Sequence, residues 1–130
     1  NMANLLAKAF RDGEIKGTKD FIKKIEFKFH ADLTVAKNIY ENYFIALYND
    51  KIKCHSIHLR VNSYECFEAI FIIPQKEYFS ESFAKAVMLT SKFKDPSDTI
   101  NLNYKFMPYS KRINYGVLES DGFLTSYGNK

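Results

Sequence analysis

The chain has 130 residues, of which 46% are hydrophobic and 26% are charged, and its formal net charge is +4. This length and composition are typical of one globular domain that buries roughly two-thirds of its unfolded surface, which excludes a largely disordered protein. The longest apolar runs, 43–48 and 69–73, are far shorter than the roughly 20 residues that a membrane-spanning helix needs. We therefore expect no membrane partner.

The basic charge is a weak guide to a partner. Lysines are interleaved with acidic residues, as in 23–28, and Arg, which reads phosphate and guanine better than Lys does, occurs at only three positions. Nucleic-acid binding through a lysine-rich surface is therefore an alternative and not the main expectation. The cations that would contact phosphates in that case are Lys24, Lys28, Arg60 and Lys105.

The N-terminal part predicts a helix followed by a strand. Asn4–Arg11 has an apolar side at helical spacing and predicts a short helix. Phe21–His30 alternates, with Ile25, Phe27 and Phe29 on one parity and charged side chains on the other. One apolar and one charged face predict a strand in a half-buried antiparallel sheet.

The middle of the chain predicts a helix and a hairpin. Asp32 fits the N-cap of a helix that runs to about Tyr48. Ile52–Val61 predicts a strand whose apolar phase slips once, as at a β-bulge. After a loop at Asn62–Tyr64, Cys66–Ile73 predicts a strand that is apolar on both faces and therefore central.

The register of this hairpin follows from its apolar residues. A three-residue loop places Ile57, Leu59 and Val61 opposite Phe67 and Ala69 on the buried side. A register that differs by one residue would bury a carboxylate in the core instead, at a much higher cost in free energy.

The C-terminal part predicts a helix, a strand and an accessory hairpin. The helix begins between Gln75 and Ser80 and ends near Phe93. Ile100–Met107 alternates again and predicts a strand. The residues after Pro108 predict a hairpin of two strands, 113–119 and 123–127, which are joined by an Asp-Gly turn.

These elements together predict an α+β fold, a two-layer sandwich in which helices cover one face of an antiparallel sheet. The order β-α-β-β-α-β is compatible with a ferredoxin-like sheet of strand order four-one-three-two. We expect a single domain over 1–130, with its core in 21–107, a short N-terminal helix and the C-terminal hairpin at 113–127.

Glycine is absent between Thr18 and Tyr115, which removes the loops that several chemistries need. No Walker A loop, dinucleotide-binding fingerprint or nucleophile elbow is present. We therefore expect no cofactor and no catalytic residue of these families, and the chain is more consistent with a binding protein than with an enzyme.

Cysteine and histidine positions do not predict a disulfide or a metal site. Cys54 and Cys66 fall out of register on neighbouring strands, so both are expected to be free thiols in a reducing, cytoplasmic compartment. His55 and His58 point to opposite faces of a regular strand and cannot share an ion there, although a bulge between them could turn them to the same face. His58 is expected across from Glu68 as an exposed polar pair.

A less favoured hypothesis is a metal-dependent or acid–base hydrolase. Glu26 and Glu68 are predicted on neighbouring strands and on the same face, where two carboxylates can transfer protons, with His30 and His58 beside them. Lysine and arginine surround this pair, so a solvated face of mixed charge explains the pattern equally well.

The face of the predicted sheet that points away from the helices is the candidate binding surface. Ile70 and Ile72 would form an apolar patch there unless the C-terminal hairpin, the N-terminal helix or a second subunit covers them. We expect a protein partner or a homodimer through this face, or along an edge strand such as Ile52–Val61. The residues assigned to this face are Lys24, Glu26, Lys28, His30, His58, Arg60, Glu68, Ile70, Ile72 and Lys105.

Overall fold

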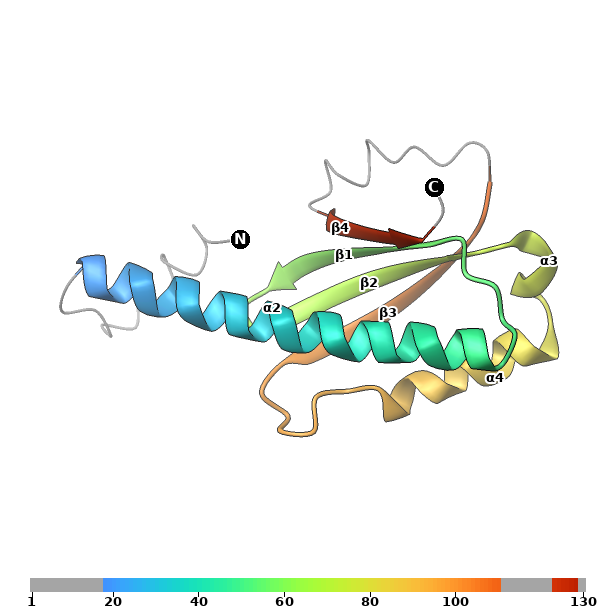
Figure 1. The fold of residues 1–130 in the computed structure, drawn as a ribbon, viewed down its shortest axis with the longest axis horizontal. Coiled ribbons are helices and arrows are strands. Elements are labelled where there is room, and N and C mark those ends of the chain that lie inside the picture. Colours follow the sequence, from blue (N-terminus) through green and yellow to red (C-terminus); the bar gives the residue numbers. More distant parts are fainter. Residues whose placement is uncertain (1–17, 111–122, 129–130) are drawn as a thin grey trace.

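The computed structural model describes residues 18–110 and 123–128, and its chain folds into helices packed against a four-stranded mixed sheet (Figure 1). The α+β class predicted from the sequence is confirmed. The predicted helix at 4–11 and strand at 113–119 lie outside the described residues. The elements are α2 (Thr18–Asn49), β1 (Ser56–Ser63), β2 (Cys66–Ile73), α3 (Gln75–Tyr78), α4 (Glu81–Leu89), the 3₁₀ helix η1 (Thr90–Lys92), β3 (Asn101–Pro108) and β4 (Phe123–Gly128).

The strand predicted at Phe21–His30 is wrong, because these residues form the first part of α2. Phe21, Ile25 and Phe29 are four residues apart, so they line one side of a helix as well as one face of a strand. No glycine or proline interrupts the helix, and Asp32 is not an N-cap: its carboxylate accepts a 2.6 Å hydrogen bond from Lys28 one turn earlier. Phe27, the apolar residue off this row, is 79% exposed.

The C-terminal end of α2 is closed by backbone hydrogen bonds of the Schellman type. The N–H of Ile52 donates to the Leu47 carbonyl at 2.9 Å, and the N–H of Lys51 donates to the Tyr48 carbonyl at 3.0 Å. Lys51 has a φ of 60°, in the left-handed region that glycine normally occupies at this position. The buried side chains of Leu47 and Ile52 provide the apolar contact that accompanies this motif.

The sheet has the strand order β3-β2-β1-β4, with β1 antiparallel to both its neighbours and β3 parallel to β2. The predicted antiparallel sheet and its ferredoxin-like order are therefore corrected. Residues 21–30 supply no strand for β3 to pair with, so β3 pairs with β2, and α3 and α4 form the crossover that parallel neighbours require. β1 is an inner strand, so it does not offer the edge that was expected for self-association.

The β1–β2 hairpin has the predicted pairing on its buried side. Leu59 faces Ala69 and Val61 faces Phe67, with a register shift between Val61 and Ser63. The turn is tighter than the predicted loop, since Ser63 already pairs with Cys66. The predicted strand 66–73 has the bounds of β2.

The core lies between the sheet and the two longer helices, which run side by side below it in Figure 1. Tyr43 of α2 is fully buried, and its hydroxyl donates a 2.7 Å hydrogen bond to the carbonyl oxygen of Ala86 on α4. Ser80 caps α4 by accepting a hydrogen bond from the Phe83 N–H. The other core side chains include Ala36, Tyr40 and Leu47 of α2, Ile57 and Leu59 of β1, and Phe67, Ala69, Phe71 and Ile73 of β2.

Candidate functional site

The candidate binding residues of segment 21–30 do not lie on the sheet. Lys24, Glu26 and His30 are exposed on α2, whose N-terminal part extends past the strands (Figure 1). Lys28 points to the β1–β2 turn, where its ammonium lies 3.4 Å from a Glu65 carboxylate oxygen as well as beside Asp32. These four side chains therefore belong to a helix and not to the predicted open sheet face.

The remaining candidates do share one side of the sheet, here called the outer face, which points away from α2 and α4. Alternation and register place every second side chain of β1, β2 and β3 on it. Ile70 and Ile72 are only 7% and 0% exposed, so the outer face does not present the bare apolar patch that the sequence suggested. The residues that these three strands place on the outer face include Ser56, His58, Arg60, Cys66, Glu68, Ile70, Ile72, Asn101, Asn103, Lys105 and Met107.

Glu68 is the centre of a charged cluster on the outer face. It faces Arg60 in the register, not His58 as predicted, and its side chain is 3% exposed. Arg60 forms an ion pair with one carboxylate oxygen, and the Lys105 ammonium lies 2.8 Å from the other. Burial raises the pKa of Glu68, but the hydrogen bonds from Lys105 and Arg60 outweigh it and leave the pKa below its usual value.

Ser56 and His58 form a second buried polar pair on the same face. The hydroxyl oxygen of Ser56 lies 2.9 Å from Nε2 of His58, and the two residues are 0% and 3% exposed. A serine beside a histidine is the start of a nucleophilic dyad, but a substrate cannot reach a pair that the protein encloses in this way. The geometry fits a structural hydrogen bond between two strand residues.

The hydrolase hypothesis needs four side chains that the fold does not gather. Glu26 and His30 are exposed on α2, whereas Glu68 and His58 are buried on the outer face of the sheet. Within the described part of the chain, the ion-pair partners of Glu68 are the two cations Arg60 and Lys105. The predicted acid–base pair of Glu26 and Glu68 is therefore not formed.

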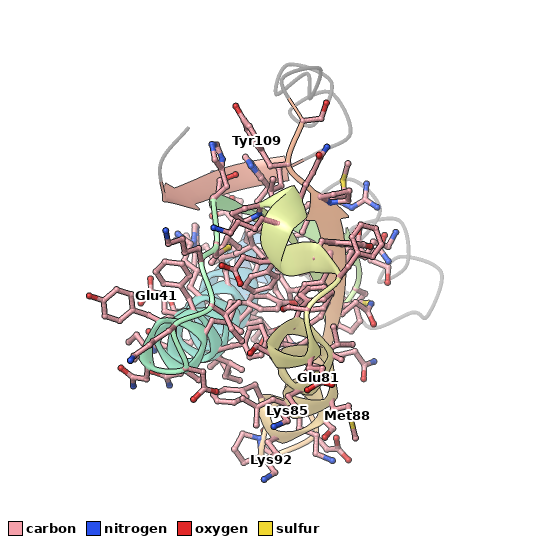
Figure 2. All side chains as sticks on the ribbon, turned by 90° about the vertical axis from the view of Figure 1, so that its right-hand side faces the viewer. Glu41, Glu81, Lys85, Met88, Lys92 and Tyr109 are labelled. Atoms are coloured by element: carbon pink, nitrogen blue, oxygen red, sulfur yellow. The ribbon has the colours of Figure 1, made fainter. Side chains whose placement is uncertain are left out.

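A different site appears where α2 ends and the chain turns into β1. A pocket of about 770 Å³ opens there, a size within the range of ligand-binding cavities. Figure 2 views this end of the molecule. We call it the α2-end pocket, and it is lined by Phe44, Tyr48, Asn49, Lys51, Ile52, Lys53, Cys54, His55 and Pro74.

The local backbone explains how these residues come together. The Schellman turn at Lys51 reverses the chain after α2, and the N–H of His55 then donates a 2.7 Å hydrogen bond to the Ile72 carbonyl of β2. This bond brings the linker 50–55 alongside the end of β2, where Pro74 follows the strand. The pocket thus has walls from a helix, a linker and a strand end.

The α2-end pocket is lined by both apolar and basic side chains. Phe44, Ile52 and Pro74 supply carbon surface, and the exposed Tyr48 ring adds more at the end of α2. Three lining residues carry basic groups, while no Asp or Glu is among the nine; the neighbouring Asp50 is exposed and does not line the pocket. The basic residues are Lys51, Lys53 and His55.

The thiol of Cys54, which lines the pocket, is held in an unreactive state. Burial raises the pKa of the Cys54 thiol to about 12, and its Sγ donates to the Ser56 carbonyl at 3.3 Å. The His55 ring stacks on the Tyr109 ring with centroids 4.1 Å apart. A protonated thiol is a poor nucleophile, so the pocket is equipped to bind rather than to form a covalent intermediate.

The sequence held only a faint signal of this pocket. Its lining comes from three elements, and the short-range pattern of each was accounted for by helix, linker or strand. The clue was the group of basic residues directly after the helix, Lys51, Lys53 and His55, of which only His55 was considered, as a possible metal ligand.

Both cysteines are free thiols in the structure. Within residues 18–110 and 123–128, no group of three or more His, Cys, Asp or Glu side chains is placed to hold a metal ion. None of the described helices has the length and apolarity to cross a membrane. Comparisons with protein-family models, with curated proteins and with solved structures found no match for this chain.

Proposed function

We propose that the protein is a small cytosolic binding module without catalytic activity, and that it binds a protein partner at the α2-end pocket. The observation that carries this proposal is the pocket itself, whose described lining combines apolar walls with lysines and includes no Asp or Glu. Free thiols such as Cys54 and Cys66 support a reducing compartment.

Support for binding over catalysis comes from the state of the reactive groups. The hydroxyl of Ser56 and the ring of His58 are buried together, and the thiol of Cys54 stays protonated near neutral pH. A general base or a nucleophile must be accessible to substrate and suitably ionised at working pH. The Ser56–His58 pair is not accessible to a substrate, and the Cys54 thiol is not ionised.

The burial of Ile70 and Ile72 moves the proposed contact away from the outer face. A homodimer across that face was expected because these side chains would otherwise meet water. Since they are already covered, dimerisation there would remove little further apolar area. The α2-end pocket offers an open apolar surface instead, so it is the better candidate for a partner.

The structure gives the nucleic-acid alternative less support than the sequence alone does. Of its four cations, Arg60 and Lys105 pair with Glu68, and Lys28 pairs with acidic side chains beside α2. A cation that already neutralises a carboxylate releases fewer counterions from a phosphate backbone. Lys24 is exposed on α2, one helical turn from Lys28, whereas Arg60 and Lys105 lie on the sheet.

Site-specific photo-crosslinking tests the proposed function. A benzophenone amino acid replaces Tyr48, which lines the pocket and is 75% exposed, or Phe27, which is 79% exposed on the same helix. The two variants are matched in exposure and element and differ in distance from the pocket. In cells that make the protein, the Tyr48 variant should give one discrete heterologous adduct and the Phe27 variant should not.

The captured protein is then purified and titrated against the unlabelled wild-type chain and against Tyr48→Ala. A complex that forms with the wild type and weakens with Tyr48→Ala supports the proposal. Equal adducts from both positions, or no complex between the purified proteins, would contradict it. An adduct with twice the mass of the chain would indicate self-association at this end instead.

A further inference from the structure

The walls of the α2-end pocket define what can fill its apolar part. Phe44, Ile52 and Pro74 line the pocket, and the exposed Tyr48 ring lines it with them. Flat rings and a proline favour an aromatic or long apolar side chain, because such a group buries much area at a small cost in conformational entropy. The pocket has the volume for one or two side chains and excludes a whole folded domain.

The rim of the pocket defines the charge of the ligand. Lys51 and Lys53 are exposed, and neither forms an ion pair with the described residues. The φ of 60° at Lys51 costs on the order of 1 kcal/mol relative to glycine, so a lysine is kept where glycine would be the more stable choice.

We propose that the α2-end pocket binds an acidic peptide segment of a partner protein, which inserts one aromatic or long apolar side chain between Phe44 and Pro74 and places its carboxylates against Lys51 and Lys53. This inference rests on the proposed function and names the chemistry of its partner. Charge complementarity selects the occupant, since the lining residues that the structure describes include two lysines and no Asp or Glu.

The same features argue against a cationic or purely apolar occupant. A basic peptide would be repelled by the lysines at the rim, and a neutral apolar group would leave them without a counter-charge. The exposed lysines of α4 and η1 provide the contrast within one chain. Lys85 and Lys92 are interspersed with Glu81 and Met88 on an outer helical surface, at the opposite side of Figure 2 from Tyr109.

The test is a selection from a random peptide library displayed on phage, with the full chain as bait. One bait is the wild type, the second is Lys51→Glu/Lys53→Glu, and the third is the matched control Lys85→Glu/Lys92→Glu, which has the same net charge as the second. Circular dichroism and thermal unfolding establish that all three baits are folded. Enriched peptides are then synthesised and titrated against each bait by fluorescence anisotropy.

We expect the wild type and the control to enrich peptides that combine Asp or Glu with an aromatic or long apolar residue. Binding to Lys51→Glu/Lys53→Glu should be weaker by about tenfold or more, and wild-type binding should weaken with added salt, because exposed ion pairs are screened. Enrichment of basic or uncharged peptides, no enrichment at all, or equal loss of binding in both double variants would overturn the inference.

The outcome is separable from that of the photo-crosslinking experiment. If a partner crosslinks at Tyr48 but no acidic peptide is selected, the protein is a binding module whose ligand has another chemistry. If acidic peptides bind the pocket but no partner crosslinks in cells, the pocket chemistry is right and the proposed protein-binding function is wrong.

Discussion

Arg60 on β1 and Glu68 on β2 face each other across neighbouring strands and form an ion pair on the outer face of the sheet. The carboxylate of Glu68 is almost fully buried, whereas the side chains of Arg60 and Lys105 are 24% and 60% exposed. Each charge of such a buried pair is stable only while its partner remains. Removal of the Glu68 carboxylate therefore leaves the partly buried Arg60 without a counter-charge.

Glu68→Gln should therefore lower the free energy of unfolding by about 2–3 kcal/mol. Lys105→Gln should cost less than about 1 kcal/mol, because Lys105 is exposed and Arg60 still holds the carboxylate. The double variant Arg60→Met/Glu68→Leu should recover most of the loss, since it removes both charges together. Urea unfolding near neutral pH measures all three, and equal losses for Glu68→Gln and Lys105→Gln would contradict the ranking.

Acid should destabilise the protein through two carboxylates. Hydrogen bonds from the Ile100 N–H and from Ser97 hold the pKa of Asp95 below its usual value, and the pKa of Glu68 is also lowered. Both groups bind protons more readily in the unfolded chain, so their stabilisation is present above the unfolded pKa values of about 4 and is lost as pH falls through the lower folded values.

Unfolding free energies measured between neutral pH and about pH 2 should thus fall steadily below about pH 4. Asp95→Asn should give a less stable protein with a shallower acid branch, because one of the two titrating groups is gone. An acid branch as steep as that of the wild type would show that Asp95 has the same pKa in the folded and unfolded chains.

Burial should make Cys54 slow to alkylate. With a pKa of about 12 against about 8.5 for an ordinary thiol, its thiolate fraction at about pH 8 is lower by on the order of a thousandfold. In a Cys66→Ser background, iodoacetamide labelling followed by intact mass spectrometry should be far slower for the folded chain than for the chain in denaturant. Rapid labelling of the folded chain would reopen the possibility of a reactive thiol.

The β1–β2 hairpin was predictable because the two strands are adjacent in the sequence and several of their apolar residues specify the same register. Only one register of β1 against β2 buries Leu59 and Val61 opposite Ala69 and Phe67, and the structure has that register. Pro74 ends β2 for the reason visible in the sequence: it has no N–H to continue a strand ladder. The prediction of which β2 side chains face the core was also correct.

The first part of α2 could not be assigned in the same way. Residues Ile25, Phe27 and Phe29 fit a strand, while Phe21, Ile25 and Phe29 fit a helix, and the two patterns share most of their members. The deciding factor is continuity with the strongly helical stretch that follows, because extending an existing helix avoids the cost of nucleating another one. The sheet order then changes with it, since a strand was removed from the centre.

The α2-end pocket was beyond the reach of sequence reasoning for a different reason. Pro74 and Phe44 line the same pocket because the Schellman turn and the His55–Ile72 hydrogen bond bring the linker alongside β2. Neither contact leaves a periodic pattern. Lys51 is an anomaly in the sequence only once its left-handed backbone is known.

Lys51 should therefore show a conflict between stability and binding. Lys51→Gly relieves the left-handed conformation while it keeps the two backbone hydrogen bonds of the helix end, so it should raise the free energy of unfolding by roughly 1 kcal/mol. This gain is smaller than the full steric cost of the left-handed conformation, because glycine also increases the conformational entropy of the unfolded chain. The same variant removes one of the two exposed ammonium groups at the pocket rim.

Lys51→Asn and Lys53→Gly separate these effects. Asparagine tolerates the left-handed region, so Lys51→Asn should be stabilising but less so than Lys51→Gly. Lys53 has no positive φ, and Lys53→Gly should be neutral or destabilising while it removes an equal charge. Affinity for acidic peptides should fall in all three variants, measured by the same anisotropy titration. If Lys51→Gly binds them as well as the wild type does, the lysine is not retained for binding and its strained backbone has no functional explanation.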